Sequence, residues 1–178
     1  CLSDYWPPFR WRGQPEWCGQ EYTGKTLLIW KEQGDGDCFQ YLRFLQMARE
    51  RGSRLVFACP CSLVNLLQGV TGADLVTQKL PADLPEVNFD YHLPLLSLPR
   101  VLGVTAEGVP PPHCLKVSAH SQRLWKERMQ SPLLKVGLVW AGQRLSQPER
   151  RSLALAALAP LSQVPQVRFY SLQKGPDA

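Results

Sequence analysis

The sequence has no long apolar run: none approaches the length of about 18 residues that a membrane-spanning helix needs. Its N-terminal residues also lack the charge order and the apolar stretch of a secretory signal peptide. These absences argue against a membrane span and an export signal, so we expect a soluble, cytoplasmic protein. Because the sequence starts with Cys1 rather than Met, we also expect it to have been excised from a longer chain.

Spacings typical of metal sites are missing as well. Cys59-Pro60-Cys61 is a Cys-x-Cys pair, whereas zinc ligands are usually two or more residues apart and have a second pair elsewhere. The chain has six cysteines, but a domain of this size without an export signal does not need disulfides. The three histidines, His92, His113 and His120, are not spaced for a metal site or a catalytic triad. We therefore expect no metal.

The composition is that of an ordinary globular protein. The 178 residues are 44% hydrophobic and 20% charged, which is enough for one good core or for one domain and part of another. The net charge of +5 comes from scattered Lys and Arg residues, and no nucleic-acid motif accompanies it. We expect a solvated basic surface and no nucleic-acid partner. An anionic small molecule such as a nucleotide sugar would suit this charge equally well.

Short apolar runs alternate with helix-period segments from Gly24 onward, which predicts an α/β fold with a mostly parallel sheet. Residues 1–23, rich in Trp and Pro, are predicted to be an aromatic leader packed onto the body. The pattern predicts a Rossmann-like, doubly wound domain over 24–131 and the start of a second one over 132–178. The predicted strands are 26–30, 54–58, 74–77, 89–93, 135–140 and 167–172, and the predicted helices are 38–52, 63–67, 118–129 and 152–161.

Two details of this pattern concern the ends of the first helix and the role of tryptophan. Gly52 stands where a helix C-cap is expected, and Asp37 where an N-cap is expected before a helix starting at Cys38. Ser62 is the expected cap of the short second helix. Trp30, Trp125 and Trp140 are expected to be packing residues rather than platforms for sugar rings.

The loops after Trp30 and Trp140 are the first places to look for a site, because ligands of open α/β sheets bind at the carboxyl ends of the strands. The first loop contains Gly34-Asp35-Gly36-Asp37, where the chain can approach a ligand closely and a helix start follows. Its spacing matches neither a dinucleotide fingerprint nor a triphosphate loop. Asp37 as an N-cap is compatible with Asp37 as the base for a bound hydroxyl.

Four blocks of sequence carry a family resemblance. The blocks are Glu32-Gln33-Gly34-Asp35-Gly36-Asp37 with Phe39-Gln40-Tyr41; Pro94-Leu95-Leu96-Ser97-Leu98-Pro99; Val136-Gly137-Leu138-Val139-Trp140-Ala141-Gly142; and Arg150-Arg151-Ser152 with Phe169-Tyr170-Ser171-Leu172-Gln173-Lys174-Gly175. They resemble, in the same order and over nearly the whole chain from Gly24, bacterial tetratricopeptide-repeat proteins that carry a C-terminal domain similar to the heptosyltransferases, of the glycosyltransferase family 9 type. By this resemblance, residues 1–23 are the end of the last helical repeat and its junction.

The resemblance implies a GT-B glycosyltransferase: two Rossmann-like domains, no required metal or cofactor, and transfer of a sugar from a nucleotide-sugar donor to a saccharide or protein acceptor. It implies that Asp37 is the catalytic base or the carboxylate that binds the acceptor. The residues it implies for substrate binding are Gln33, Gly34 and Gly36 in the first loop, and Gln143, Arg151, Ser152, Gln173 and Lys174 near the donor. Positive charge there would neutralise the departing nucleoside diphosphate.

The chain departs from the family pattern in two ways. Gln143 stands where relatives usually have Asn, and the later donor-binding segment of the family lies beyond Ala178. We therefore expect the chain to be inactive in isolation. An incomplete second domain would expose apolar strand edges, which predicts a homodimer formed through that segment.

Three functions remain open at this point. The first is a glycosyltransferase, which predicts that the chain binds a nucleotide sugar. The second is a non-catalytic interaction or scaffold module that keeps the GT-B fold, for which Asp37 would be dispensable. The third is a dinucleotide-dependent Rossmann enzyme, which the glycine spacing disfavours.

Overall fold

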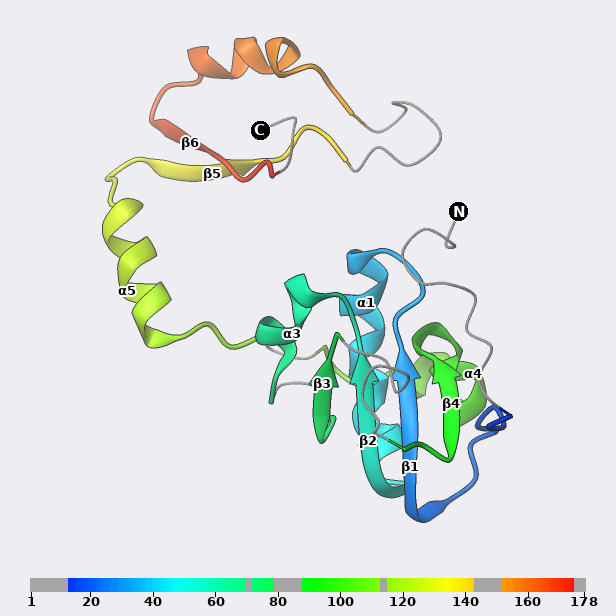
Figure 1. Cartoon of the computed structure of the whole chain (residues 1–178). Coiled ribbons are helices and arrows are strands. Elements are labelled where there is room, and N and C mark those ends of the chain that lie inside the picture. Colours follow the sequence, from blue (N-terminus) through cyan, green and yellow to red (C-terminus); the bar gives the residue numbers. More distant parts are fainter. Residues whose placement is uncertain (1–12, 70–71, 79–87, 113–114, 143–151, 175–178) are drawn as a thin grey trace. The chain divides into compact units, whose positions relative to one another are not determined.

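The computed structural model describes residues 13–69, 72–78, 88–112, 115–142 and 152–174. The chain divides into two compact units, with the division between Val117 and Ser118 (Figure 1). The boundary predicted after residue 131 falls inside the second of these units, after the helix α5 (Ala119–Arg128).

The first unit contains a sheet of four parallel strands in the order β3-β2-β1-β4. This order and the flanking helices confirm the predicted α/β class and are consistent with a Rossmann-like fold. In the central register, Leu28 of β1 is level with Val56 of β2 and His92 of β4. The strands are β1 (Tyr22–Trp30), β2 (Gly52–Ala58), β3 (Leu75–Thr77) and β4 (Tyr91–Pro94).

The strand β1 is central because its apolar run is buried on both faces. Leu27, Leu28 and Ile29 are all fully buried. Leu27 and Ile29 belong to the main core, whereas Leu28 belongs to a smaller cluster on the other face, which Trp30 packs against. Such continuous burial is typical of parallel strands. The prediction that Trp30 is a packing residue is confirmed.

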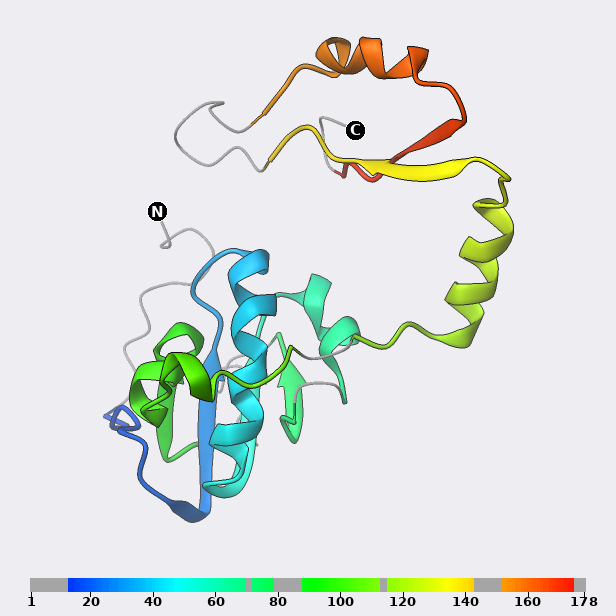
Figure 2. The same ribbon diagram turned by 180° about the vertical axis from the view of Figure 1, so that it is seen from behind.

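The helices of the first unit supply the main core. The stretch of α1 and α2 lies across one face of the sheet (Figure 2). Gly103, in the left-handed conformation with φ of 67°, ends α4. The helices are α1 (Asp35–Tyr41), the 3-10 turn η2 (Leu42–Phe44), α2 (Leu45–Arg49), α3 (Cys61–Leu67), the 3-10 turn η3 (Leu95–Ser97), α4 (Leu98–Leu102) and the 3-10 turn η4 (Ala106–Gly108).

Three predicted helix caps are wrong. The first helix begins at Asp35, with Gly34 as its N-cap, so Asp37 lies inside the first turn. The α2 helix ends at Arg49, and Gly52 is instead the first residue of β2. The N-cap of α3 is Pro60, which leaves Ser62 within the helix.

The residues just before β1 belong to the core, which corrects the prediction of a leader packed on the outside. Trp17 is fully buried, and its ring meets that of Tyr22 edge-on at 5.8 Å between centroids. Its indole nitrogen donates a hydrogen bond to the carbonyl of Gln20 at 2.8 Å. Glu16 forms a parallel bridge with His92, so this segment lies along β4.

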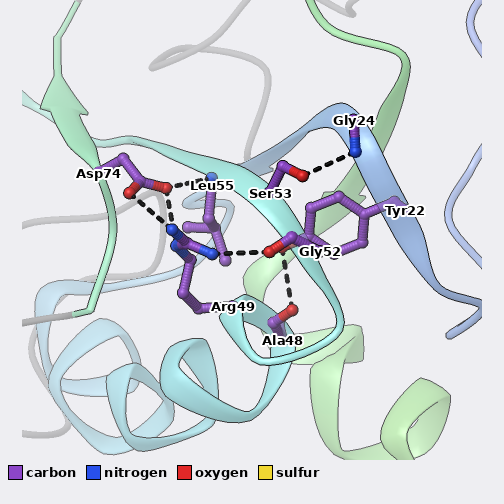
Figure 3. A network of polar contacts seen from close by, with 8 residues as sticks. All are labelled: Tyr22, Gly24, Ala48, Arg49, Gly52, Ser53, Leu55 and Asp74. Carbon is purple, nitrogen blue, oxygen red and sulfur yellow. Dashed lines mark hydrogen bonds and ion pairs between the residues drawn. The ribbon is translucent and has the colours of Figure 1, made fainter.

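Polar contacts join the sheet and helix at the edge opposite the carboxyl ends of the strands (Figure 3). Both oxygens of Asp74 contact the guanidinium of Arg49, at 2.9 and 3.1 Å, and Asp74 also accepts from the Leu55 amide at 2.7 Å. Arg49 donates to the Gly52 carbonyl at 2.6 Å. This network fixes the end of α2 against the starts of β2 and β3.

The second unit contains a pair of parallel strands joined by a helical crossover. The crossover is a 3-10 helix of nine residues rather than the predicted α-helix. Pro160 lies inside it and lacks the N–H group that an α-helix would use there. The elements are α5 (Ala119–Arg128), β5 (Leu134–Leu138), η5 (Leu155–Gln163) and β6 (Val167–Ser171).

The two tryptophans of the second unit differ in their exposure to solvent. Trp140 is buried, at 9% exposure, as predicted for a packing residue. Trp125 is 54% exposed. The guanidinium carbon of Arg128 lies over its ring, 5.6 Å from the ring centroid. The prediction that Trp125 is a packing residue is wrong, because α5 has no buried residue.

Candidate functional site

The strand order reverses between β1 and β4. The chain proceeds from β1 to β2 and β3 on one side, and β4 is added on the other side of β1. The segments that follow β1 and β4 pack in the same core cluster. Open α/β sheets bind ligands at the carboxyl ends of their strands, next to the point where the strand order reverses. The loop of residues 31–37 follows β1 at this place, and Leu95 and Leu96 follow β4. We call residues 31–37 the switch-point loop.

Glu32 connects the switch-point loop to the segment after β4. Its Oε1 atom accepts a hydrogen bond from the Leu96 amide at 3.0 Å. Its Oε2 atom is buried and has no hydrogen-bond partner among the described residues. Burial raises the pKa of the Glu32 carboxyl, although nearby backbone N–H groups and the Lys31 charge oppose this effect. Glu32 is thus a half-buried acid at the switch point.

Lys31 is the buried charged residue of this loop, at 8% exposure. Its backbone N–H donates to the Ala58 carbonyl at 3.0 Å, which extends the ladder between β1 and β2 by one residue. Its amine donates to the Gln33 carbonyl at 2.5 Å and lies 3.0 Å from Oδ1 of Asp35. The amine therefore spans the turn from Gln33 to Asp35.

Asp37 is exposed in the first turn of α1. Its carboxylate forms no hydrogen bond or ion pair within the part of the chain that the structure describes. A Cβ atom placed on Gly34 would lie 3.3 Å from Oδ2 of Asp37, whereas one on Gly36 would meet nothing within 4 Å. Asp35 is occupied by Lys31, so Asp37 is the aspartate of this loop that is free to meet a ligand.

Two buried thiols lie near Lys31 and Asp35. Burial raises the pKa of Cys38 and of Cys59 to about 12, and the neighbouring Cys59 adds to the effect on Cys38. Both thiols are fully buried. Because the thiolate is the reactive form, neither cysteine is suited to act as a nucleophile. The chemistry of the loop is therefore that of its carboxylates.

In the second unit, Gln173 and Ser152 hold the loop after β5. Gln173 accepts from the amides of Trp140 and Ala141 at 3.1 and 3.0 Å, and donates to the Ala141 carbonyl at 3.0 Å. The Ser152 hydroxyl accepts from the Gly142 amide at 3.1 Å. These side-chain groups are engaged with the backbone, whereas the neighbouring Lys174 is exposed.

The predicted site residues thus fall into two groups. Gln33, Gly34, Gly36 and Asp37 lie together in the switch-point loop of the first unit. Ser152, Gln173 and Lys174 lie in the second unit, near the carboxyl ends of β5 and β6. Gln143 and Arg151 lie outside the described residues. Within the described ranges, no cluster of three or more His, Cys, Asp or Glu side chains could hold a metal ion.

Lys31 and Glu32 were not predicted from the sequence as parts of the site. Both follow the buried run of β1 directly, which is the signal that could have identified them. A charged pair at the end of a buried strand has to place its side chains on opposite sides of the sheet. One of the two is then forced into the interior, where it needs partners.

Comparisons with protein-family models, with curated proteins and with solved structures found no match. No helix among the described segments is both long and apolar enough to cross a membrane.

Proposed function

We propose that the chain is a glycosyltransferase-like module that transfers a sugar from a nucleotide-sugar donor to a hydroxyl group of a saccharide or protein acceptor. The observation that carries this proposal is the position of Asp37. It is an exposed carboxylate at the switch point, and it is unpaired within the described segments, while the neighbouring Asp35 is neutralised by Lys31. A free carboxylate at this place can accept a proton from a bound hydroxyl.

The proposed reaction needs one base and one stabilised leaving group. Asp37 takes the proton of the acceptor hydroxyl as its oxygen forms a bond to the anomeric carbon of the donor sugar. The bond from that carbon to the diphosphate oxygen breaks, and the nucleoside diphosphate leaves with the bonding electron pair. The acidic switch-point loop suits a neutral polyhydroxyl acceptor better than a phosphate, because Asp35 and Asp37 both lie in the first turn of α1.

The donor would be bound by the second unit in a GT-B arrangement. Lys174 is an exposed cation beside the carboxyl end of β6, which suits the charge of a diphosphate. Gln173 and Ser152, which hold the loop after β5, would act by shaping that loop. This refines the sequence prediction, in which all three side chains approach the donor.

A non-catalytic interaction module is the second candidate function. The observation that favours it is the exposure of large apolar side chains in the second unit, including Leu134 and Val139 at 66% and Leu172 at 60%. Such residues are typical of a surface that another molecule covers. In that case Asp37 could be replaced without effect.

The proposed function is tested on the longer chain that the sequence leads us to expect, in which a donor-binding segment follows Ala178. The ligands are nucleotide sugars of several bases and sugars, with monosaccharides as acceptors. Calorimetric titration measures binding, and release of the nucleoside diphosphate measures transfer. We expect Asp37→Asn to lower the release rate by about 10²-fold or more while binding stays within about threefold, because only the base is lost. Glu50→Gln is the matched control, since Glu50 is an exposed carboxylate after α2, at the opposite edge of the sheet. Failure of every nucleotide sugar to bind the unsubstituted chain, or equal release by the Asp37→Asn variant, would refute the proposal.

A further inference from the structure

The switch-point loop is attached to both strands that flank β1. Lys31 continues the hydrogen-bonded ladder toward β2 through the Ala58 carbonyl. Glu32, the next residue, reaches the other way and accepts from the Leu96 amide just after β4. The backbone N–H of one residue and the side chain of the next make these two attachments. The start of the loop is therefore tied to the segments at the carboxyl ends of both neighbouring strands.

The buried amine of Lys31 then determines the shape of the turn. A buried ammonium group without partners is strongly unfavourable, so the Gln33 carbonyl and the Asp35 carboxylate have to close over it. Gly34, the N-cap of α1, lies between Gln33 and Asp35, the two residues that contact the Lys31 amine. Asp37 follows in the same helical turn, and its Oδ2 atom lies over Gly34. The position of Asp37 thus depends on contacts that Asp37 does not make itself.

We infer that Lys31 and Glu32 are positioning residues that hold the switch-point loop, and Asp37 with it, in the geometry that meets the acceptor. This inference rests on the proposed function, because the role of Asp37 does. Lys31 acts through the Gln33 carbonyl and Asp35, and Glu32 acts through the Leu96 amide. Neither residue needs to touch the substrate.

Substitutions of Glu32 can distinguish a residue that only accepts a hydrogen bond from a residue that acts as a catalytic acid. Glu32→Gln keeps a side-chain oxygen that can accept from the Leu96 amide, whereas Glu32→Ala does not. Burial raises the pKa of the Glu32 carboxyl, so the site already favours an uncharged side chain. The neutral side-chain amide of Glu32→Gln therefore costs no more to bury than the native carboxyl group. If Glu32 worked through its charge, the Gln variant would fail as completely as the Ala variant.

The matched substitution for Lys31 is Lys31→Met, which fills a similar volume without the amine. Removing one partner of an ion pair is strongly destabilising where the remaining charge stays buried. Asp35 is left without its partner, but its side chain is 57% exposed and stays hydrated. The Met variant should therefore remain folded while the turn from Gln33 to Asp35 is released.

The experiment measures amide hydrogen exchange of Cys38, which donates to the Gly34 carbonyl, and of Leu96, which donates to Glu32. Titration of nucleotide sugars and release of the nucleoside diphosphate are measured on the same longer chain as above. We expect Lys31→Met and Glu32→Ala to exchange these amides about tenfold faster, at an unchanged thermal midpoint for Lys31→Met, and to lower the release rate by a similar factor. Glu32→Gln should behave like the unsubstituted chain in both measurements.

The two readouts separate the inference from the proposed function. Unchanged exchange in folded Lys31→Met and Glu32→Ala would overturn the inference even if the chain transfers sugar. Failure of Glu32→Gln to restore release, with exchange restored, would also overturn it, since it would assign a chemical role to the charge. Faster exchange in a chain that binds no nucleotide sugar would leave the attachment of the loop established and refute the proposed function.

Discussion

At the scale of single residues, the contact between Tyr22 and Gly52 shows why the strand β2 starts with glycine. The Tyr22 ring lies against Gly52 so closely that a Cβ atom at position 52 would overlap with it. The phenol donates a hydrogen bond to the Ala48 carbonyl at 2.9 Å (Figure 3). The glycine predicted to cap a helix is therefore required for space beside an aromatic ring. A sequence pattern cannot show this, because the two residues are 30 positions apart in the chain.

Tyr22→Phe tests this contact and has a defined pH dependence. Burial raises the pKa of Tyr22 from 10.0 to about 12, so the folded state favours the neutral phenol. The resulting stability is fully present below pH 10 and is lost as the pH rises toward 12. At pH 7 we expect Tyr22→Phe to lower the free energy of unfolding by about 1 kcal/mol, the value of one hydrogen bond.

Urea unfolding at pH 7, 9 and 11 measures the difference between the two chains. The difference should shrink at pH 11, because the unsubstituted chain loses the contribution of its phenol there. A difference that grows with pH, or a Phe variant more stable than the unsubstituted chain at pH 7, would contradict the assigned hydrogen bond.

At the scale of elements, Asp74 connects the end of α2 to the starts of β2 and β3. Its carboxylate pairs with Arg49 and accepts from the Leu55 amide. The ion pair is about one-third exposed on each side, so solvent screens it and the amide contact should dominate. We expect Asp74→Ala to lower the free energy of unfolding by about 1–3 kcal/mol, because it leaves the Leu55 N–H unpaired.

Asp74→Asn is the matched control, since its side-chain oxygen can still accept from the Leu55 amide. Chemical unfolding of the three chains should show that the Asn variant loses less than half of what the Ala variant loses. Equal losses would mean that the charge pair, and not the amide contact, holds this edge together.

The elements also show how far the sequence predicts this fold. Runs of buried residues gave the strands of the first sheet to within a few residues, because parallel strands are apolar on both faces. The starts of α1 and α3 were missed because their N-caps, Gly34 and Pro60, make no side-chain hydrogen bond to the helix. The crossover η5 was predicted as a helix, but its 3-10 geometry was not, because that geometry follows from Pro160 rather than from a composition rich in alanine and leucine.

At the scale of the whole molecule, the two units differ in how many of their described hydrophobic side chains are buried. The first unit has a core of many fully buried side chains, whereas Trp140 is the buried hydrophobic residue among the described part of the second unit. Composition alone did not predict this contrast, because exposed and buried leucines look alike in a sequence. The same limit applies to the site. The sequence predicted a role for the loop and for Asp37, whereas the roles inferred for Lys31 and Glu32 required the contacts that cross from β1 to β2 and β4.

The most direct test of the central claim is to map a bound ligand on the chain. In ¹H–¹⁵N spectra of the 178-residue chain, titration with the nucleotide sugars and monosaccharides should shift the amides of residues 33–37 and of Leu96 most strongly in the first unit. The same titration of the Asp37→Asn variant should preserve the map. Shifts concentrated at the opposite edge, around Gly52, Leu55 and Asp74, or no shift with any of these ligands, would contradict a substrate site at the carboxyl ends of β1 and β4.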